Sequence, residues 1–125
     1  MSSGADGALT RGLIVASAEK AQLQATSLRA RGYAVACAVT PVTGDLRQTQ
    51  AAIARTLRLP DTAGTNLDAL EDSLRDLTDI WGGPVALLWE GAEHLARADS
   101  QGWWVLTDIL DAADLPVIAT GAARR

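Results

Sequence analysis

Residues 82–89 read GGPVALLW, and this stretch decides the fold. A Gly-Gly-Pro break precedes five consecutive apolar residues, 85–89. A short apolar run bounded by a turn is typical of a buried strand, and Pro84 is tolerated at its edge because the first residue of a strand need not donate a hydrogen bond. The stretch therefore predicts a strand in the interior of a sheet.

The segments on both sides of this strand alternate between helical and strand patterns. The predicted strands are 13–16, 33–40, 85–89 and 115–119, and the predicted helices are 18–31, 45–57, 66–77 and 102–113. Strands separated by helices pair in parallel through right-handed crossovers. The sequence predicts an α/β fold, with a small parallel sheet of three to four strands and helices packed on it.

Length and composition predict one soluble domain. The chain has 125 residues, enough for a single core without disulfides or a structural metal. Apolar runs of about five residues fall far short of the roughly 20 that span a membrane, and the N-terminus lacks the pattern of an export signal. With one cysteine, Cys37, no internal disulfide is possible. We expect a cytoplasmic protein, with residues 1–11 a flexible N-terminus and residues 121–125 a tail.

Charge is divided unevenly along the chain. Residues 1–59 carry seven basic and three acidic groups, a net charge of +4, whereas residues 60–125 carry four basic and twelve acidic groups, a net charge of −8. Nucleic acid binding needs a basic surface, which this chain lacks, so we expect no direct contact with nucleic acid. A basic partner is the complement of the acidic half.

The chain contains none of the common catalytic motifs. Glycine-rich nucleotide loops and the HExxH, GxSxG and CxxC patterns are all missing from the sequence. One histidine and one cysteine cannot build a Cys/His metal cluster, so no metal or cofactor is predicted. His94 is interpreted as a surface histidine, and Cys37 as a small buried apolar residue. No catalytic residue is predicted.

Residues 59–74, LPDTAGTNLDALEDSL, hold the main candidate site. Four leucines anchor one face of the predicted helix 66–77 on the core: Leu67, Leu70, Leu74 and Leu77. Carboxylates at helical spacing lie away from that stripe: Asp68, Glu71, Asp72 and Asp76. Like charges at this spacing cost a few tenths of a kcal/mol per pair, and only Arg75 compensates them locally. Residues 65–68 match a capping box, which accounts for Asp68 alone.

This segment resembles the barstar family of ribonuclease inhibitors. The residues in common are Leu59, Pro60, Gly64, residues 66–70 (NLDAL), Asp72 and Leu74. Downstream, residues 84–89 resemble the family's second strand, and Val105, Leu106 and Asp111 resemble its last helix. The resemblance covers about residues 33–120. It implies a single domain, 12–120, in which residues 33–120 form the core and residues 12–32 an added βα unit.

The resemblance also implies a function without catalysis. Such a protein binds over the active site of a secreted guanyl-type ribonuclease in a 1:1 complex and thereby protects the cell that makes the enzyme. It is expected to be a monomer when free. Asp68 and Asp72 are the implied main contacts, with Gly64 and Asn66 shaping the preceding loop. The remaining predicted contacts are Thr65, Glu71, Asp76 and Asp111. Carboxylates one helical turn apart can occupy sites that hold RNA phosphates, so the helix is expected to mimic phosphate.

Three departures from the family pattern keep alternatives open. Thr62 and Ala63 stand where the family has aromatic residues, and Glu71 stands where it has tryptophan. Buried aromatic residues commonly dominate binding energy, so an immunity protein or antitoxin for a different basic toxin is the first alternative. A small magnesium-dependent phosphoryl-transfer enzyme that uses Asp68 and Asp72 is the second.

Overall fold

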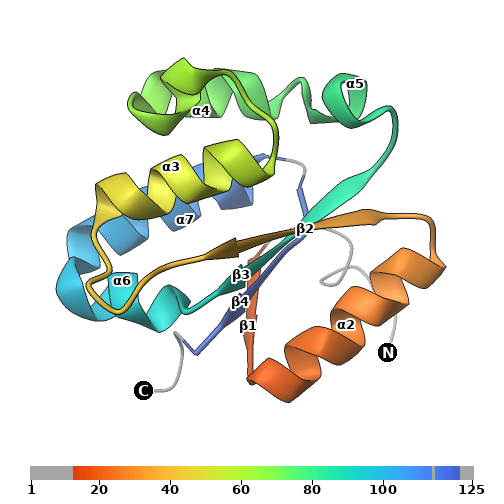
Figure 1. Cartoon of the computed structure of the whole chain (residues 1–125), viewed down its shortest axis with the longest axis horizontal. Helices are drawn as coiled ribbons and strands as arrows, with labels where there is room; N and C mark the ends of the chain where they lie inside the picture. Colours follow the sequence, from red (N-terminus) through yellow and green to blue (C-terminus); the bar gives the residue numbers. More distant parts are fainter. Residues whose placement is uncertain (1–12, 114, 122–125) are drawn as a thin grey trace.

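A computed structural model describes residues 13–113 and 115–121, and these ranges form an α/β fold (Figure 1). The strands are β1 (Leu13–Ala16), β2 (Ala34–Val39), β3 (Val85–Glu90) and β4 (Val117–Thr120). The helices are α2 (Ala18–Ala30), α3 (Leu46–Thr56), α4 (Leu67–Leu74), α5 (Leu77–Trp81), α6 (Ala92–Ala98) and α7 (Ser100–Ala112), with a 3₁₀ turn at Asp61–Gly64. The predicted fold class is confirmed. The predicted N-terminal segment 1–11 and residues 122–125 of the predicted tail lie outside the described residues.

All four strands are parallel and lie in the order β1-β4-β3-β2. Residues 85–89 are all buried, as predicted for an interior strand. Gly82, with φ of +72°, ends α5 and turns the chain into β3, a conformation that glycine adopts without strain. β1 pairs with β4, with Leu13 opposite Val117, so the first and last strands of the chain are neighbours.

The larger core lies on the face of the sheet that α3 and α7 cover, and α4 adds Leu70 and Leu74 to it (Figure 1). Trp89 is fully buried there, its indole Nε1 donates to the Thr40 hydroxyl at 2.7 Å, and its ring lies 5.3 Å from that of Trp103. The Thr40 oxygen lies 3.2 Å from the hydroxyl of Thr49, which itself donates to the Asp45 carbonyl. These hydrogen bonds join Trp89 of β3, Thr40 just beyond β2 and Thr49 of α3 in one chain.

The smaller core lies on the opposite face of the sheet, under α2 (Figure 1). Ser17 caps the start of α2 by accepting from the Lys20 amide. Its buried side chains meet those of β3 and β4: Ala21, Ala25 and Leu28 from the helix, and Ala86, Leu88 and Ile118 from the strands. The βα unit formed by β1 and α2 therefore covers apolar strand residues that lie within the span of the barstar resemblance.

Leu28→Ala is expected to lower the free energy of unfolding by about 2–5 kcal/mol, because the side chain is 1% exposed and its loss leaves a cavity against the sheet. Leu23→Ala, on the exposed side of the same helix, is the matched control and is expected to change stability by less than about 0.5 kcal/mol. Urea unfolding measures both. Equal small effects would show that α2 does not pack on the sheet.

Cys37 differs from its interpretation as a buried residue. It lies on β2 and is exposed, whereas its neighbours Ala36 and Ala38 are buried. β2 is the last strand in the sheet order, and alternate side chains of a strand point to opposite faces. α2 packs on Val35 of the same face but does not bury Cys37.

Candidate protein-binding site

The turn that leads into α4 is fixed against α3. Gln50 is buried on α3 and donates from its side-chain amide to the Ala63 carbonyl at 3.0 Å. Ala63 is fully buried, and a Cβ at Gly64 would lie 3.4 Å from the Ala51 Cα. The 3₁₀ turn is therefore a packed element, and it sets where α4 begins.

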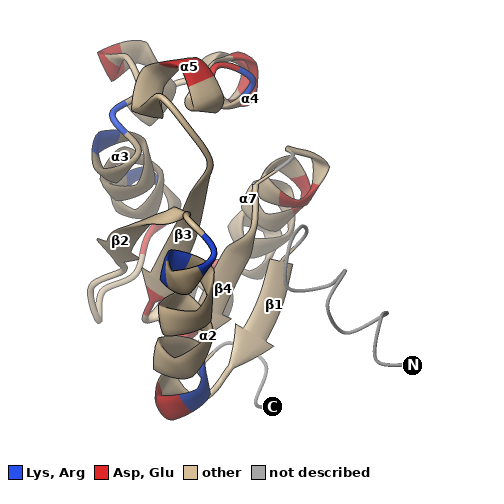
Figure 2. Cartoon of the chain, turned by 90° about the vertical axis from the view of Figure 1, so that its right-hand side faces the viewer, with Lys and Arg blue, Asp and Glu red and all other residues tan. Residues whose placement is uncertain are grey.

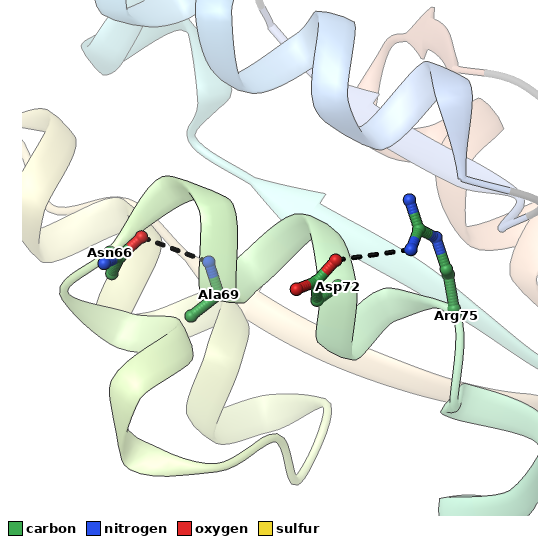
Figure 3. Close-up of polar contacts among 4 residues, drawn as sticks. All are labelled: Asn66, Ala69, Asp72 and Arg75. Atoms are coloured by element: carbon green, nitrogen blue, oxygen red, sulfur yellow. Dashed lines mark hydrogen bonds and ion pairs between the residues drawn. The ribbon is translucent and has the colours of Figure 1, made fainter.

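The first turn of α4 is capped by Asn66 (Figure 3). Its side-chain oxygen accepts from the Ala69 amide at 3.1 Å. The predicted capping box starting at Thr65 is wrong by one residue, because the Thr65 hydroxyl is directed to the Thr62 carbonyl, at 3.5 Å. Asp68 lies in the first turn, where the helix dipole favours an acidic side chain.

Asn66→Ala is expected to lower the free energy of unfolding by about 1 kcal/mol, because one amide of the first turn loses its acceptor. Asn66→Asp should keep most of the stability. Thr65→Ala is the control for the position that the sequence pattern favours and should have little effect. Thermal unfolding of the three variants distinguishes the two caps, and a larger loss for Thr65→Ala would contradict the structure.

Leucines hold α4 on the core and turn its carboxylates outward. Leu70 and Leu74 are buried, whereas Asp68, Glu71 and Asp72 are exposed. The arrangement has the separation of leucine and carboxylate faces that the sequence predicts. α4 thus presents three carboxylates from a helix that is fixed by packing.

In the part of the chain that the structure describes, a carboxylate of α4 forms an ion pair with Arg75. The guanidinium of Arg75 lies 3.3 Å from the Asp72 carboxylate, as an i,i+3 pair (Figure 3). Both side chains are 73% exposed, and an ion pair in that position contributes little stability. A partner can therefore displace Arg75 from Asp72 at small cost.

Asp76 lies beyond the end of α4. The predicted helix 66–77 is two helices, because α4 ends at Leu74 and α5 begins at Leu77. The amides of Arg75 and Asp76 donate to the carbonyls three residues back, which tightens and ends the helix. Asp76 is exposed in the turn between the helices.

Asp111 lies on the side of α7 that faces β1. Its carboxylate accepts from the Leu13 amide at 3.2 Å. A cleft of about 740 Å³ separates α4 from α7, and its lining includes Glu71 of α4 with Ile109 and Ala112 of α7, but not Asp111. The structure therefore brings Asp68, Glu71 and Asp72 together and does not bring Asp111 beside them. Periodicity alone did not reveal that Ile109 faces this cleft.

The three positions at which the sequence departs from the family's aromatic residues are not all on the surface. Thr62 and Glu71 are exposed and Ala63 is buried. Trp81, the last residue of α5, has its own partners: its indole Nε1 donates to the Leu57 carbonyl at 2.9 Å and the Arg58 guanidinium lies 4.0 Å from its ring centre. Trp81 is thus bound to the end of α3.

His94 and Cys37 were considered above for chemistry, and the structure shows what each of them contacts. The Nδ1 atom of His94 lies 3.0 Å from the Thr40 carbonyl, which links α6 to the end of β2. The pKa of the Cys37 thiol is raised overall, first because part of the side chain is buried and then because the Glu90 carboxylate lies near it. Arg29 acts in the opposite direction and offsets part of this effect.

Within residues 13–113 and 115–121, no group of three or more metal-binding side chains is formed. No helix in the described part of the chain is long and apolar enough to cross a membrane.

Comparison with known proteins identifies one family. No curated protein and no solved structure matches the chain. Residues 36–120 match the family described as Barstar (barnase inhibitor), and this confirms the resemblance found in residues 59–74. The match begins within β2, so β1 and α2 precede it. Because it spans more than half of the sequence, the chain belongs to the barstar family.

Proposed function

We propose that the chain is a non-catalytic inhibitor of a basic guanyl-type ribonuclease, which it binds in a 1:1 complex, covering the active site with α4. The observation that carries the proposal is the exposed group of carboxylates, Asp68, Glu71 and Asp72, on a helix fixed to the core by Leu70 and Leu74. Family membership supports it. We further propose that the protein acts in the cytoplasm of the cell that makes the enzyme.

The proposed mechanism is replacement of RNA phosphates by carboxylates. A ribonuclease must hold the phosphates of its substrate with arginine, lysine or histidine. Asp68 and Asp72 are one helical turn apart, about 5–6 Å between Cβ atoms, and Glu71 is adjacent to both. Charge-assisted hydrogen bonds to such groups are about twice as strong as neutral ones. The inhibitor thus fills the cationic sites without offering a bond to cleave.

Charge on α4 also favours association. In the free protein Asp68 repels Asp72 slightly, and cationic groups of an enzyme would remove that repulsion. The excess of acid in residues 60–125 extends this field over the second half of the chain. Opposite potentials raise the association rate, most strongly at low salt.

Titration of barnase with the purified chain tests the proposal. We expect activity to fall linearly and to vanish near one equivalent, with an association rate that decreases as salt is added. A chain carrying Asp68→Ala and Asp72→Ala is the control and should inhibit far less. Full barnase activity at micromolar concentrations of the chain would contradict inhibition of this enzyme.

The missing aromatic residues favour a second candidate function, that of an immunity protein for another basic toxin. The positions concerned are Thr62, Ala63 and Glu71. They place a carboxylate and small side chains where family members have aromatic anchors, so the surface depends more on charge. Affinity capture from the source cells, with the Asp72→Ala chain as control, tests this candidate. Recovery of a basic protein without ribonuclease activity, by the unmodified chain only, would support it.

A further inference from the structure

A groove of about 750 Å³ lies along α7 on the side that faces β1. Trp104, Asp108 and Asp111 from α7 and Leu13 from β1 contribute to its lining. Trp104 is 69% exposed, although Trp103 beside it packs on Trp89 in the core. The groove is distinct from the cleft between α4 and α7, and it involves a strand that precedes the family match.

The groove combines an aromatic face with acidic groups. Among the described residues, the charged groups in its lining are Asp108 and Asp111, and both are acidic. Asp108 follows Trp104 by four residues on α7, so the carboxylate lies on the same side of the helix as the indole. An exposed indole attracts cations over its face, and long cationic side chains rest their aliphatic stems on apolar surface. The chemistry that fits is an arginine or lysine side chain.

We propose that this groove is a second docking surface for the basic partner of α4, and that it takes an arginine or lysine side chain between Trp104 and Asp108. The inference rests on the proposed function. A second copy of the chain is disfavoured as the occupant, because each copy has a net charge of −4 and would bring further carboxylates to the groove.

The position of α7 allows one partner to reach both surfaces. Glu71 of α4 and Ile109 of α7 line the same cleft, and the opposite side of α7 lines the groove with β1. Figure 2 shows acidic residues on both α4 and α7. A basic protein seated on α4 and extending across α7 would meet Trp104 next.

Binding to barnase, measured by titration calorimetry, tests the groove separately from α4. Trp104→Ala is expected to raise Kd about tenfold, because it removes the face on which the cation lies. Trp104→Phe should restore most of the affinity, and Asp108→Asn should weaken binding in a salt-dependent way. Leu23→Ala, which shortens another exposed apolar side chain on α2, is the matched control and should leave Kd unchanged.

The outcomes separate the two proposals. If barnase binds and Asp72→Ala weakens the complex but Trp104→Ala does not, the groove proposal is overturned and the inhibitor proposal stands. If barnase is not bound at all, the inhibitor proposal fails for this enzyme, and a hexa-arginine peptide then tests the groove. We expect the peptide to shift the indole N–H resonance of Trp104, assigned by its loss in Trp104→Phe, and Asp108→Asn to reduce the shift. An unmoved indole resonance would overturn the groove proposal.

Discussion

Replacing Asp72 by alanine is expected to weaken the complex with a ribonuclease roughly a hundredfold, whereas replacing Asp76 should change it little. Asp72 lies on the exposed face of α4, and in the proposed complex it is enclosed against a cationic group of the enzyme. Removing one member of an enclosed ion pair leaves the other charge desolvated without a partner, at a cost of about 3 kcal/mol, which is roughly a factor of one hundred in Kd. Asp76 lies in the turn beyond α4.

Both variants are expected to fold normally, which keeps the comparison interpretable. The pair between Asp72 and Arg75 is exposed on both sides, so its loss should change the free energy of unfolding by less than about 1 kcal/mol. Calorimetric titration against barnase measures Kd, and thermal unfolding confirms the fold. Equal weakening by Asp72→Ala and Asp76→Ala would refute the placement of the contact on α4.

Trp89→Ala is expected to lower the free energy of unfolding by about 3–5 kcal/mol, because it empties the centre of the larger core. The side chain is fully buried, contacts the ring of Trp103, and donates a hydrogen bond to Thr40. The variant leaves a cavity beside β3 and removes the donor from a buried hydroxyl. Urea unfolding at neutral pH, followed by far-UV circular dichroism, measures the loss.

Two variants separate the ring of Trp89 from its hydrogen bond. Trp89→Phe keeps most of the aromatic volume and removes only the donor, so we expect an intermediate loss. Trp104→Ala removes an exposed indole from α7 and should have a small effect on stability. A loss for Trp89→Ala no larger than that for Trp104→Ala would contradict the position of Trp89 in the core.

The strands and their order along the chain were predictable because burial leaves a direct trace in the sequence. Residues 85–89 are apolar without interruption, and the structure buries all of them. The predicted start of α7, residue 102, is two residues late, because Ser100 and Gln101 carry no apolar side chain that would mark them as helical. The Asp99 side chain accepts from the Gly102 amide at 2.8 Å and thereby extends the helix backward from the predicted residue 102.

The break between α4 and α5 could not be obtained from periodicity. Leu70, Leu74 and Leu77 keep helical spacing across the turn, and all three are buried, so the apolar pattern is the same for one helix or two. What ends α4 is a change in backbone hydrogen bonding at Arg75 and Asp76, which leaves no mark in side-chain composition. The helix that carries the acidic side chains was therefore predicted correctly for its first two turns and too long at its end.

The surroundings of Cys37 and Asp111 could not be predicted from sequence because they depend on tertiary structure. The exposure of Cys37 depends on how far α2 extends over the outer strand, and the bond between Asp111 and the Leu13 amide joins residues at opposite ends of the described chain. Neither follows from local pattern. The surroundings of Asp111 also depend on β1, which the family match does not include.

The pairing of β1 with β4 has a consequence for synthesis on the ribosome. Leu13 lies opposite Val117, so β1 is synthesised well before the strand that pairs with it. Contacts between residues this far apart in sequence form late and slow folding. The apolar side chains of α2 pack on β3 and β4, so they are expected to stay uncovered until those strands have been synthesised, and exposed apolar surface of this kind favours aggregation.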